Sequence, residues 1–314
     1  MQQKKQLLKI KDIDSVLKDI TLSANISESE KRQYVEKILA GPFLDLRSDW
    51  AFKYFFSIKE NLIKFINDVL PVSITDLEYL PNEIPVRSEK DKRSVLDVRC
   101  KSGSDQFLVE MQRLEESDMD DRILYYGSTI LHNQVKRGDE KYLLQPVYVL
   151  CVADYDINHS EPVPDGKFLF HYHNLEHEIQ EPFDGDKIHY FFLELPRMKK
   201  IWQRTETNAE RWSYLIENLS TFVRPLTGDL FGFDSVVDNA RIDTLSGEEQ
   251  KEYVQDMVTK HYIRVTSEAA FNRGIESVAK KMLLKSIPVE TIAECTDLEP
   301  EEILKIKASL ENQS

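Results

Sequence analysis

The sequence predicts an α/β protein in which a small mixed sheet is flanked by helices and followed by an all-helical region. The continuous apolar run 146–152 has the length and composition of a strand buried on both faces. Two β-prone runs, 95–100 and 107–112, flank a loop that contains Gly103, which is typical of a hairpin. From about residue 197 onward, apolar residues recur only at helical spacing. This succession favours a sheet core with a C-terminal helical annex.

The first 41 residues are expected to form an N-terminal helical extension. Apolar residues follow the helical period over 12–22 and 27–39. Ser27 and Glu30 have the spacing of a capping box, which marks the start of the second of these helices.

The next segment leads into the sheet. A broad apolar face at the 3.6-residue period predicts one helix over 48–70, which Pro71 ends. Short strand-like pieces follow at 77–80 and 84–87, before the hairpin.

Helix and strand signals alternate through the rest of the chain. A helix is predicted over 118–137, and residues 154–187 are rich in proline and glycine and are expected to be loops. A further strand is predicted over 188–195 and a long charged helix over 247–286, with two short helices after it near 288–295 and 299–310. We therefore expect three regions, namely the extension 1–41, a sheet core 42–200 and a helical C-terminal region 201–314.

The composition indicates a folded, acidic protein. Of 314 residues, 41% are apolar and 31% are charged, and 41 Lys and Arg against 55 Asp and Glu give a formal net charge of −14. Such a charge argues against a protein that coats DNA by charge alone. The apolar runs fall short of the roughly 20 residues of a membrane helix, and the N-terminus lacks a signal-peptide pattern. We expect no membrane association.

The spacing of the cysteines and the absence of nucleotide-binding motifs exclude further classes of protein. Cys100, Cys151 and Cys295 are far apart and lack CxxC spacing, which argues against a disulfide framework or a cysteine zinc site and fits a cytoplasmic protein. Neither GxGxxG nor GxxxxGK[ST] occurs. We therefore expect no small-molecule cofactor.

The hairpin register follows from its turn. If Gly103 and Ser104 are the central turn residues, the numbers of opposed residues sum to 207. A slip by one residue would scramble the apolar side, so this register is well specified. The apolar pairs are then Leu96 with Met111, Val98 with Val109, and Cys100 with Phe107.

The same register places Asp97 opposite Glu110. Like charges at cross-strand distance repel by about 3 kcal/mol at an effective dielectric constant near 20. A divalent cation between the carboxylates would turn this repulsion into a net attraction. Mg²⁺ is commonly held by one or two carboxylates. Gln112 points from the same face as Glu110. The alternative is a solvated acidic face compensated by Arg99, which also lies on that face.

Several segments in order resemble the PD-(D/E)XK nuclease family transposases, also called Rpn-type recombination-promoting nucleases. The resemblance spans roughly residues 42–310. It rests on 48–56 (SDWAFKYFF), 61–70 (NLIKFINDVL), 96–99 (LDVR), 109–112 (VEMQ), 122–126 (RILYY), 145–150 (QPVYVL) and 192–196 (FLELP).

The resemblance implies a restriction-endonuclease-like core and a metal-dependent DNA endonuclease. Asp97, Glu110 and the carbonyl of Met111 would bind Mg²⁺, for which Mn²⁺ is a substitute. Gln112 stands where the motif has lysine, and its amide cannot add positive charge to a transition state. Asp49 matches an additional acidic position, and helix capping is the alternative for it.

Four basic residues are candidates for contact with DNA, namely Lys53, Arg99, Arg113 and Arg122. A solvated role for Lys53, and packing of Arg122 beside Tyr126, are the alternatives. A positive rim around the hairpin is expected to include these further residues: Arg87, Lys90, Lys92, Arg93 and Lys101.

Two further features of the sequence give weaker indications of a functional site. His171, His173, His177 and His189 invite a zinc interpretation, but their loop-rich surroundings favour edge-strand or surface histidines. The tail resembles a helix-turn-helix, yet its second helix opens with acids that would repel phosphates, which favours packing or a homodimer contact.

The leading hypothesis is therefore a Mg²⁺-dependent endonuclease acting on DNA in recombination or transposition. The alternative is a catalytically inactive nuclease fold that serves as a DNA-binding or protein-interaction module. Cleavage of RNA would use the same chemistry.

Overall fold

The computed structural model describes most of the chain. The described residues are 27–83, 96–136, 138–222, 230–285, 287–296 and 298–311. The expected helix over 12–22, the expected strand over 84–87 and the basic residues of the rim between 87 and 93 lie outside these ranges.

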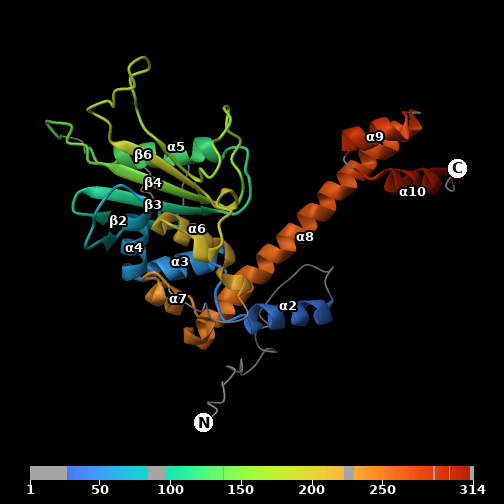
Figure 1. Ribbon diagram of the computed structural model, residues 1–314, viewed down its shortest axis with the longest axis horizontal. Helices are drawn as coiled ribbons and strands as arrows, with labels where there is room; N and C mark the ends of the chain where they lie inside the picture. The colour runs from blue at the N-terminus through green and yellow to red at the C-terminus, as the bar shows by residue number, and fades with distance from the viewer. Residues whose placement is uncertain are drawn as a thin grey trace, which may run out of the picture.

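A mixed sheet forms the centre of the molecule (Figure 1). Its strands are β1 (Glu78–Tyr79), β2 (Val98–Ser102), β3 (Asp105–Gln112), β4 (Val147–Ala153), β5 (Leu169–Tyr172) and β6 (Ile188–Glu194). Their order is β1-β2-β3-β4-β6-β5. β3, β4 and β6 run parallel, whereas the other pairs are antiparallel. The carboxyl ends of β3, β4 and β6 therefore share one edge, where ligands of α/β proteins usually bind.

The β2–β3 hairpin has the predicted register. Val98 lies opposite Val109, and Cys100 lies opposite Phe107. Gly103 adopts a φ of +57° in the turn. A positive φ is the conformation that a type II′ turn requires at its first central residue and that glycine adopts without strain.

The prediction that Leu96 extends the apolar side opposite Met111 is wrong. β2 begins at Val98, so Leu96 precedes the strand and is not bound by its alternation. Its side chain packs in the same cluster as Leu108, whereas Met111 belongs to the cluster on the other face. The chain therefore changes direction at the residue between Leu96 and Val98.

Helices cover both faces of the sheet (Figure 1). The α-helices of the described residues are α2 (Glu28–Ala40), α3 (Asp49–Ser57), α4 (Lys59–Val69), α5 (Met119–His132), α6 (Asn208–Asn218), α7 (Asp234–Asn239), α8 (Gly247–Leu284), α9 (Val289–Thr296) and α10 (Pro300–Glu311). One face, with α3, α4 and α6, carries the larger core cluster, which includes Phe52, Phe56 and Trp212. The other face carries α5, which contributes Ile123 and Ile130 to a second cluster.

The expected single helix over 48–70 is two helices. α3 ends at Ser57, Ile58 has an extended backbone, and α4 begins at Lys59. The break allows each helix to turn its own apolar face toward the same cluster, which explains why the apolar pattern runs on across it. The capping box at Ser27 and Glu30 is present as predicted.

The middle of the chain departs from prediction at two places. The helix expected over 118–137 ends at His132, five residues early. The region 154–187, expected to be loops, contains β5, which pairs with β6 at the edge of the sheet. β5 has four residues, of which only Phe170 is buried, so it lacks the apolar alternation that marks a strand.

The long helix α8 extends away from the sheet, and α9 and α10 pack at its far end (Figure 1). These three helices share a small cluster formed by Ala279, Ile292, Ile303 and Ile306. The start of α8 instead packs on α2, through Val254. In the described part of the chain, no helix is both long and apolar enough to span a membrane.

The expected boundary at residue 200 stays a prediction. The larger core cluster contains residues from both sides of it, including Phe52 before and Trp212 after. Trp212 also donates from its indole Nε1 to Asp68 of α4, at 2.9 Å. Residues of α6 therefore help to hold the helices that cover the sheet.

Candidate active site

Asp97 and Glu110 meet where β2 begins and β3 approaches its end. The backbone N–H of Asp97 donates to Oε1 of Glu110 at 3.0 Å. The backbone N–H of Met111 donates to Oδ2 of Asp97 at 2.9 Å. The two reciprocal bonds hold each carboxylate against the opposite segment, one residue beyond the last pair of the ladder, Val98 with Val109.

The two carboxylates are buried and repel each other. Asp97 is 9% exposed and Glu110 is 3% exposed. Burial raises the pKa of both groups above the ordinary values, and the charge of Asp97 raises the pKa of Glu110 further. The positive charges of Arg122 and Lys53 oppose this rise at Glu110. The pair therefore lacks enough positive charge nearby to hold both carboxylates ionised.

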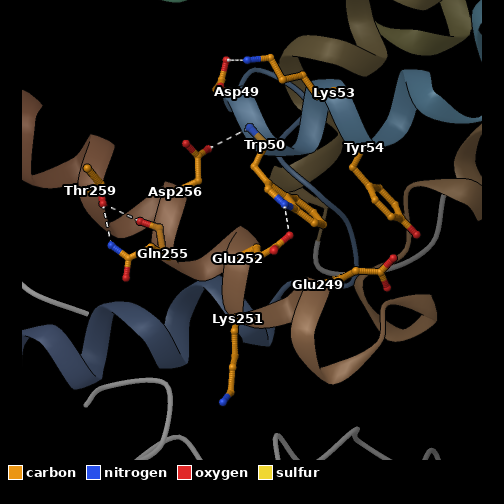
Figure 2. Close-up of a pocket in the computed structure, with 10 residues that line it drawn as sticks. All are labelled: Asp49, Trp50, Lys53, Tyr54, Glu249, Lys251, Glu252, Gln255, Asp256 and Thr259. Carbon is orange, nitrogen blue, oxygen red and sulfur yellow. Dashed lines mark hydrogen bonds and ion pairs between the residues drawn. The ribbon is translucent and has the colours of Figure 1, made fainter. Parts of the chain in front are cut away.

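Lys53 links this pair to Asp49. Its Nζ lies 2.9 Å from Oδ1 of Asp49, a contact shown in Figure 2. The same Nζ lies 3.1 Å from Oδ1 of Asp97. Partial burial lowers the pKa of Lys53, but the charges of Asp97 and Asp49 outweigh this and raise it above the ordinary value. The ammonium group is thus held charged between the two carboxylates.

The position of α3 determines where Asp49 and Lys53 lie. Ser48, not Asp49, caps the helix, because its hydroxyl accepts from the backbone N–H of Ala51 at 3.2 Å. Asp49 is instead the first residue of the helix, where an acid interacts favourably with the helix dipole. As residues i and i+4, Asp49 and Lys53 lie on one side of α3.

α8 fixes the amino end of α3 from the other side (Figure 2). The backbone N–H of Trp50 donates to Asp256 at 3.3 Å, and its indole Nε1 donates to Glu252 at 2.8 Å. The hydroxyl of Tyr253 accepts from the backbone N–H of Asp45 at 2.9 Å. These contacts with one turn of α8 position the helix that carries Asp49 and Lys53.

Gln112 and Arg113 follow Glu110 at the carboxyl edge of the sheet. Gln112 is 8% exposed and lies beside Ala153 of β4. Arg113 lies 3.5 Å from Asp45 and 4.0 Å from Asp154. Its guanidinium is therefore held close to the site by two acids.

Arg122 and Arg99 lie at different ends of the hairpin. Arg122 at the start of α5 pairs with Glu116, and its charge acts on Glu110. Its guanidinium carbon is also 6.0 Å from the centre of the Tyr126 ring, so the expected packing contact is present. Arg99 instead donates to Oε1 of Gln106 at 3.0 Å, toward the turn of the hairpin. The structure brings Arg122, but not Arg99, to the carboxylate pair.

The comparison with known protein families agrees with this geometry. The description "PD-(D/E)XK nuclease family transposase" matches residues 46–265, which run from just before α3 into α8. The chain belongs to the PD-(D/E)XK nuclease family transposases. The match includes both the hairpin and α3, and it ends before α9 and α10. No curated protein and no solved structure matches the sequence.

The residues of this PD-(D/E)XK nuclease family transposase fit a hard divalent cation. The available donors are carboxylate and carbonyl oxygens, from Asp97, Glu110 and Met111, which are the ligands that Mg²⁺ prefers. An ammonium group already lies against Asp97, so this position accommodates positive charge. Among the described residues, no set of three or more His, Cys, Asp or Glu side chains is arranged to hold a metal. Mg²⁺ commonly needs only one or two carboxylates, with waters and phosphate oxygens as its other ligands.

Three residues beside the site, Asp45, Arg47 and Asp154, were not among the sequence candidates. Arg47 lies 2.9 Å from Asp45 and 3.5 Å from Asp154, and so joins Arg113 at the same two acids. Asp154 directly follows the buried strand β4, and a polar residue at that point is a signal that sequence reasoning could have used. Arg47 gives no such signal, because only the fold brings it there.

The four histidines do not act as one group. His171 lies 3.2 Å from His189 between ring nitrogens, and its ring stacks on His173 with centroids 4.6 Å apart. Burial, together with the neighbouring histidines, lowers the pKa of His171 to about 4. These three residues lie along β5 and β6 at the edge of the sheet, away from Asp97.

Proposed function

We propose that this transposase-family chain is an endonuclease that hydrolyses phosphodiester bonds of DNA with a bound divalent cation, Mg²⁺ or Mn²⁺. The observation that carries the proposal is the pair of carboxylates, Asp97 and Glu110, held together at the ends of β2 and β3. Membership of the family supports a nuclease-like function related to recombination or transposition.

In this proposal Asp97, Glu110 and the carbonyl of Met111 hold the cation. A cation bound there supplies a Lewis acid for the scissile phosphate and lowers the pKa of an attacking water. The burial of both carboxylates favours this use, because a buried pair of acids gains most from a cation. Gln112 orients a water or a phosphate oxygen through its amide.

Lys53 supplies the positive charge that Gln112 cannot. The family motif has lysine where this chain has Gln112, and Lys53 holds its ammonium group 3.1 Å from Asp97. A phosphate that reaches Asp97 therefore also meets Lys53, whose charge stabilises the charge that develops in the transition state. Asp49 orients Lys53 through its ion pair.

DNA would approach from the carboxyl edge of β3 and β4. Arg47 and Arg113 are 21% and 30% exposed in their side chains there, and Arg122 borders the site from α5. These guanidinium groups are suited to phosphate contacts that position a nucleic acid without reading its sequence. The overall charge of −14 makes such local positive groups necessary for binding.

Nicking of supercoiled plasmid tests the proposal. Wild-type protein is expected to convert supercoiled DNA to open-circular or linear forms with Mg²⁺ or Mn²⁺ but not with EDTA. The variants Asp97→Ala and Glu110→Ala are expected to be inactive. Asp105→Ala removes an acid from the other end of β3 and is the matched control. Full activity of both site variants would remove the assignment of the site.

A second candidate is a nuclease fold without catalytic activity that binds DNA or protein. The observation that favours it is the low exposure of Glu110, 3%, together with the backbone N–H groups that already occupy one oxygen of each carboxylate. A folded wild-type protein that neither cleaves plasmid nor binds Mn²⁺ would support this candidate.

A further inference from the structure

A second cavity lies on the α5 face of the sheet, apart from the carboxylate pair. Its volume is about 660 Å³, within the range of sites that bind small organic molecules. It is enclosed by the first turns of α5, the loop that follows β4, and strands β5 and β6. The apolar part of its wall consists chiefly of Leu124, Ile157, Val163, Phe170, Tyr190 and Phe192.

The strand register places this cavity close to the proposed site of cleavage. Gln112 of β3 is paired with Ala153 of β4, which is paired with Glu194 of β6. Neighbouring strands are about 4.8 Å apart, so Glu194 lies about 10 Å from Gln112 along the same edge. Phe192, two residues before Glu194, lines the cavity. The cavity and the proposed site of cleavage therefore lie two strands apart in the sheet, within reach of one bound nucleic acid.

The wall of the cavity is built on a buried carboxylate. Glu194 is fully buried, and its Oε1 lies 2.6 Å from Nε2 of His159. Its Oε2 accepts from the backbone N–H of Ile157 at 3.0 Å and from Nε of Arg197 at 2.5 Å. The ring of His159 stacks on Phe170, with centroids 4.3 Å apart. These bonds hold the loop after β4 against the sheet, so the cavity is formed before a ligand arrives.

The chemistry of the wall favours a neutral heteroaromatic ring. Aromatic side chains line much of the cavity, and the rings of Tyr172, which is 47% exposed, and of half-buried Tyr190 are those on which a base can stack. Asp120 and Glu161 line the cavity with Lys167 as the only other fully charged side chain, so the lining disfavours a phosphate. Asp120 can accept a hydrogen bond from the edge of a base, whereas both ring nitrogens of His159 already have partners, in Glu194 and the hydroxyl of Tyr172.

We propose that this cavity receives one unpaired nucleobase of the DNA, within a few nucleotides of the phosphodiester bond that is cleaved. The proposal rests on the proposed nuclease function, and it identifies the substrate as DNA with an unpaired base. Successive nucleotides are about 3.4 Å apart along a duplex strand, so a distance of about 10 Å places the base within about three nucleotides of the cut. Removing a base from the stack costs least where it is already unpaired, which gives preference for bulged or single-stranded DNA.

Binding to two bulged duplexes tests the proposal in EDTA, where no cleavage is expected. One 20-base-pair duplex carries a single unpaired 2-aminopurine nucleotide, and the other carries an unpaired abasic nucleotide at the same place. Both duplexes have the same number of backbone nucleotides, so the ratio of their Kd values compares an unpaired base with no base at that position. Stacking of one base on aromatic side chains corresponds to a factor of about 5 to 160 in Kd. Wild-type protein is expected to bind the 2-aminopurine duplex at least fivefold more tightly, with a change in 2-aminopurine fluorescence.

Two variants alter the cavity at exposed positions, where folding is least affected. Tyr172→Ala removes a side chain that is 47% exposed, and Leu124→Glu adds charge at one that is 55% exposed. Both are expected to bring the Kd ratio to about one. Tyr142→Ala is the matched control, since Tyr142 is 83% exposed and lies outside the cavity, and it should keep the wild-type ratio.

A ratio near one for wild-type protein would overturn the proposal, and so would a ratio that both cavity variants leave unchanged. Plasmid nicking by the same preparations separates this result from the proposed function. Nicking without base preference in binding contradicts only the base site. Base-dependent binding without nicking contradicts only the nuclease.

Discussion

Replacement of Lys53 by methionine tests the part of the site that compensates for Gln112. Lys53 Nζ lies 3.1 Å from Oδ1 of Asp97, so a phosphate oxygen that approaches Asp97 comes within about 5 Å of the ammonium group. At that distance, and at an effective dielectric constant near 20, the attraction is about 3 kcal/mol. The Lys53 side chain is 34% exposed, and solvent reduces the value to about 2 kcal/mol, or about 30-fold in kcat.

The assay is the initial rate of plasmid nicking at saturating Mg²⁺, with unfolding by urea as the check on folding. Lys59→Met is the matched control, because Lys59 is on the neighbouring helix, is 40% exposed in its side chain and pairs with Asp76. Lys53→Met is expected to lose about 30-fold in kcat, while Lys59→Met keeps the wild-type value. The double variant Lys53→Met with Gln112→Lys should recover part of the loss. An unchanged kcat for Lys53→Met, or an equal loss in the control, would refute the assignment.

Three other predictions concern stability. Glu110→Gln should raise the free energy of unfolding in EDTA at pH 7.5, and the gain should shrink toward pH 4.5. The raised pKa means that folded Glu110 keeps a proton that the unfolded chain releases, so wild-type stability falls as pH rises above 4.5. Ser48→Ala should cost about 1 kcal/mol in urea unfolding, because the cap of α3 is lost; no loss would show that the cap is replaceable. Wild-type stability should fall as pH falls from 6.5 toward 4, because folded His171 stays neutral while the unfolded chain takes up a proton, and His171→Phe should weaken that dependence.

The hairpin could be predicted in detail because its sequence restricts it strongly. Apolar residues on one side and a glycine at the turn leave one register, and that register brings Asp97 to Glu110. The prediction failed two residues outside the strand, at Leu96, where the alternation no longer applies. The pairing of residues across the hairpin could thus be predicted from the sequence as far as the ladder of hydrogen bonds extends.

Elements that depend on tertiary packing were less predictable. The apolar spacing of 48–70 does not reveal the break at Ile58, because both helices bury their residues in one cluster. The edge strand β5 has one buried residue, so it lacks the alternation of apolar and polar residues by which a strand is predicted. Both features follow from the docking of segments on the sheet rather than from their own residues.

Dependence on tertiary packing also explains which site residues could be predicted from the sequence and which could not. Glu110 and Gln112 are close in the chain, and the hairpin adds Asp97. The contact of Lys53 with Asp97 instead depends on where α3 lies. Arg47 reaches Asp154, which is 107 residues away, only through the fold.

We expect Asp97 and Glu110 together to bind one divalent cation. Electron paramagnetic resonance of Mn²⁺ titrated with protein measures this directly, because bound Mn²⁺ loses the signal of the free ion. Wild-type protein is expected to bind one Mn²⁺ per chain, and Mg²⁺ should displace it. The variants Asp97→Asn and Glu110→Gln should bind Mn²⁺ at least tenfold more weakly. The control variant Asp105→Asn should bind it as the wild-type protein does. Equal Mn²⁺ binding by the wild-type protein and both site variants would contradict the claim, and so would the absence of binding by folded wild-type protein.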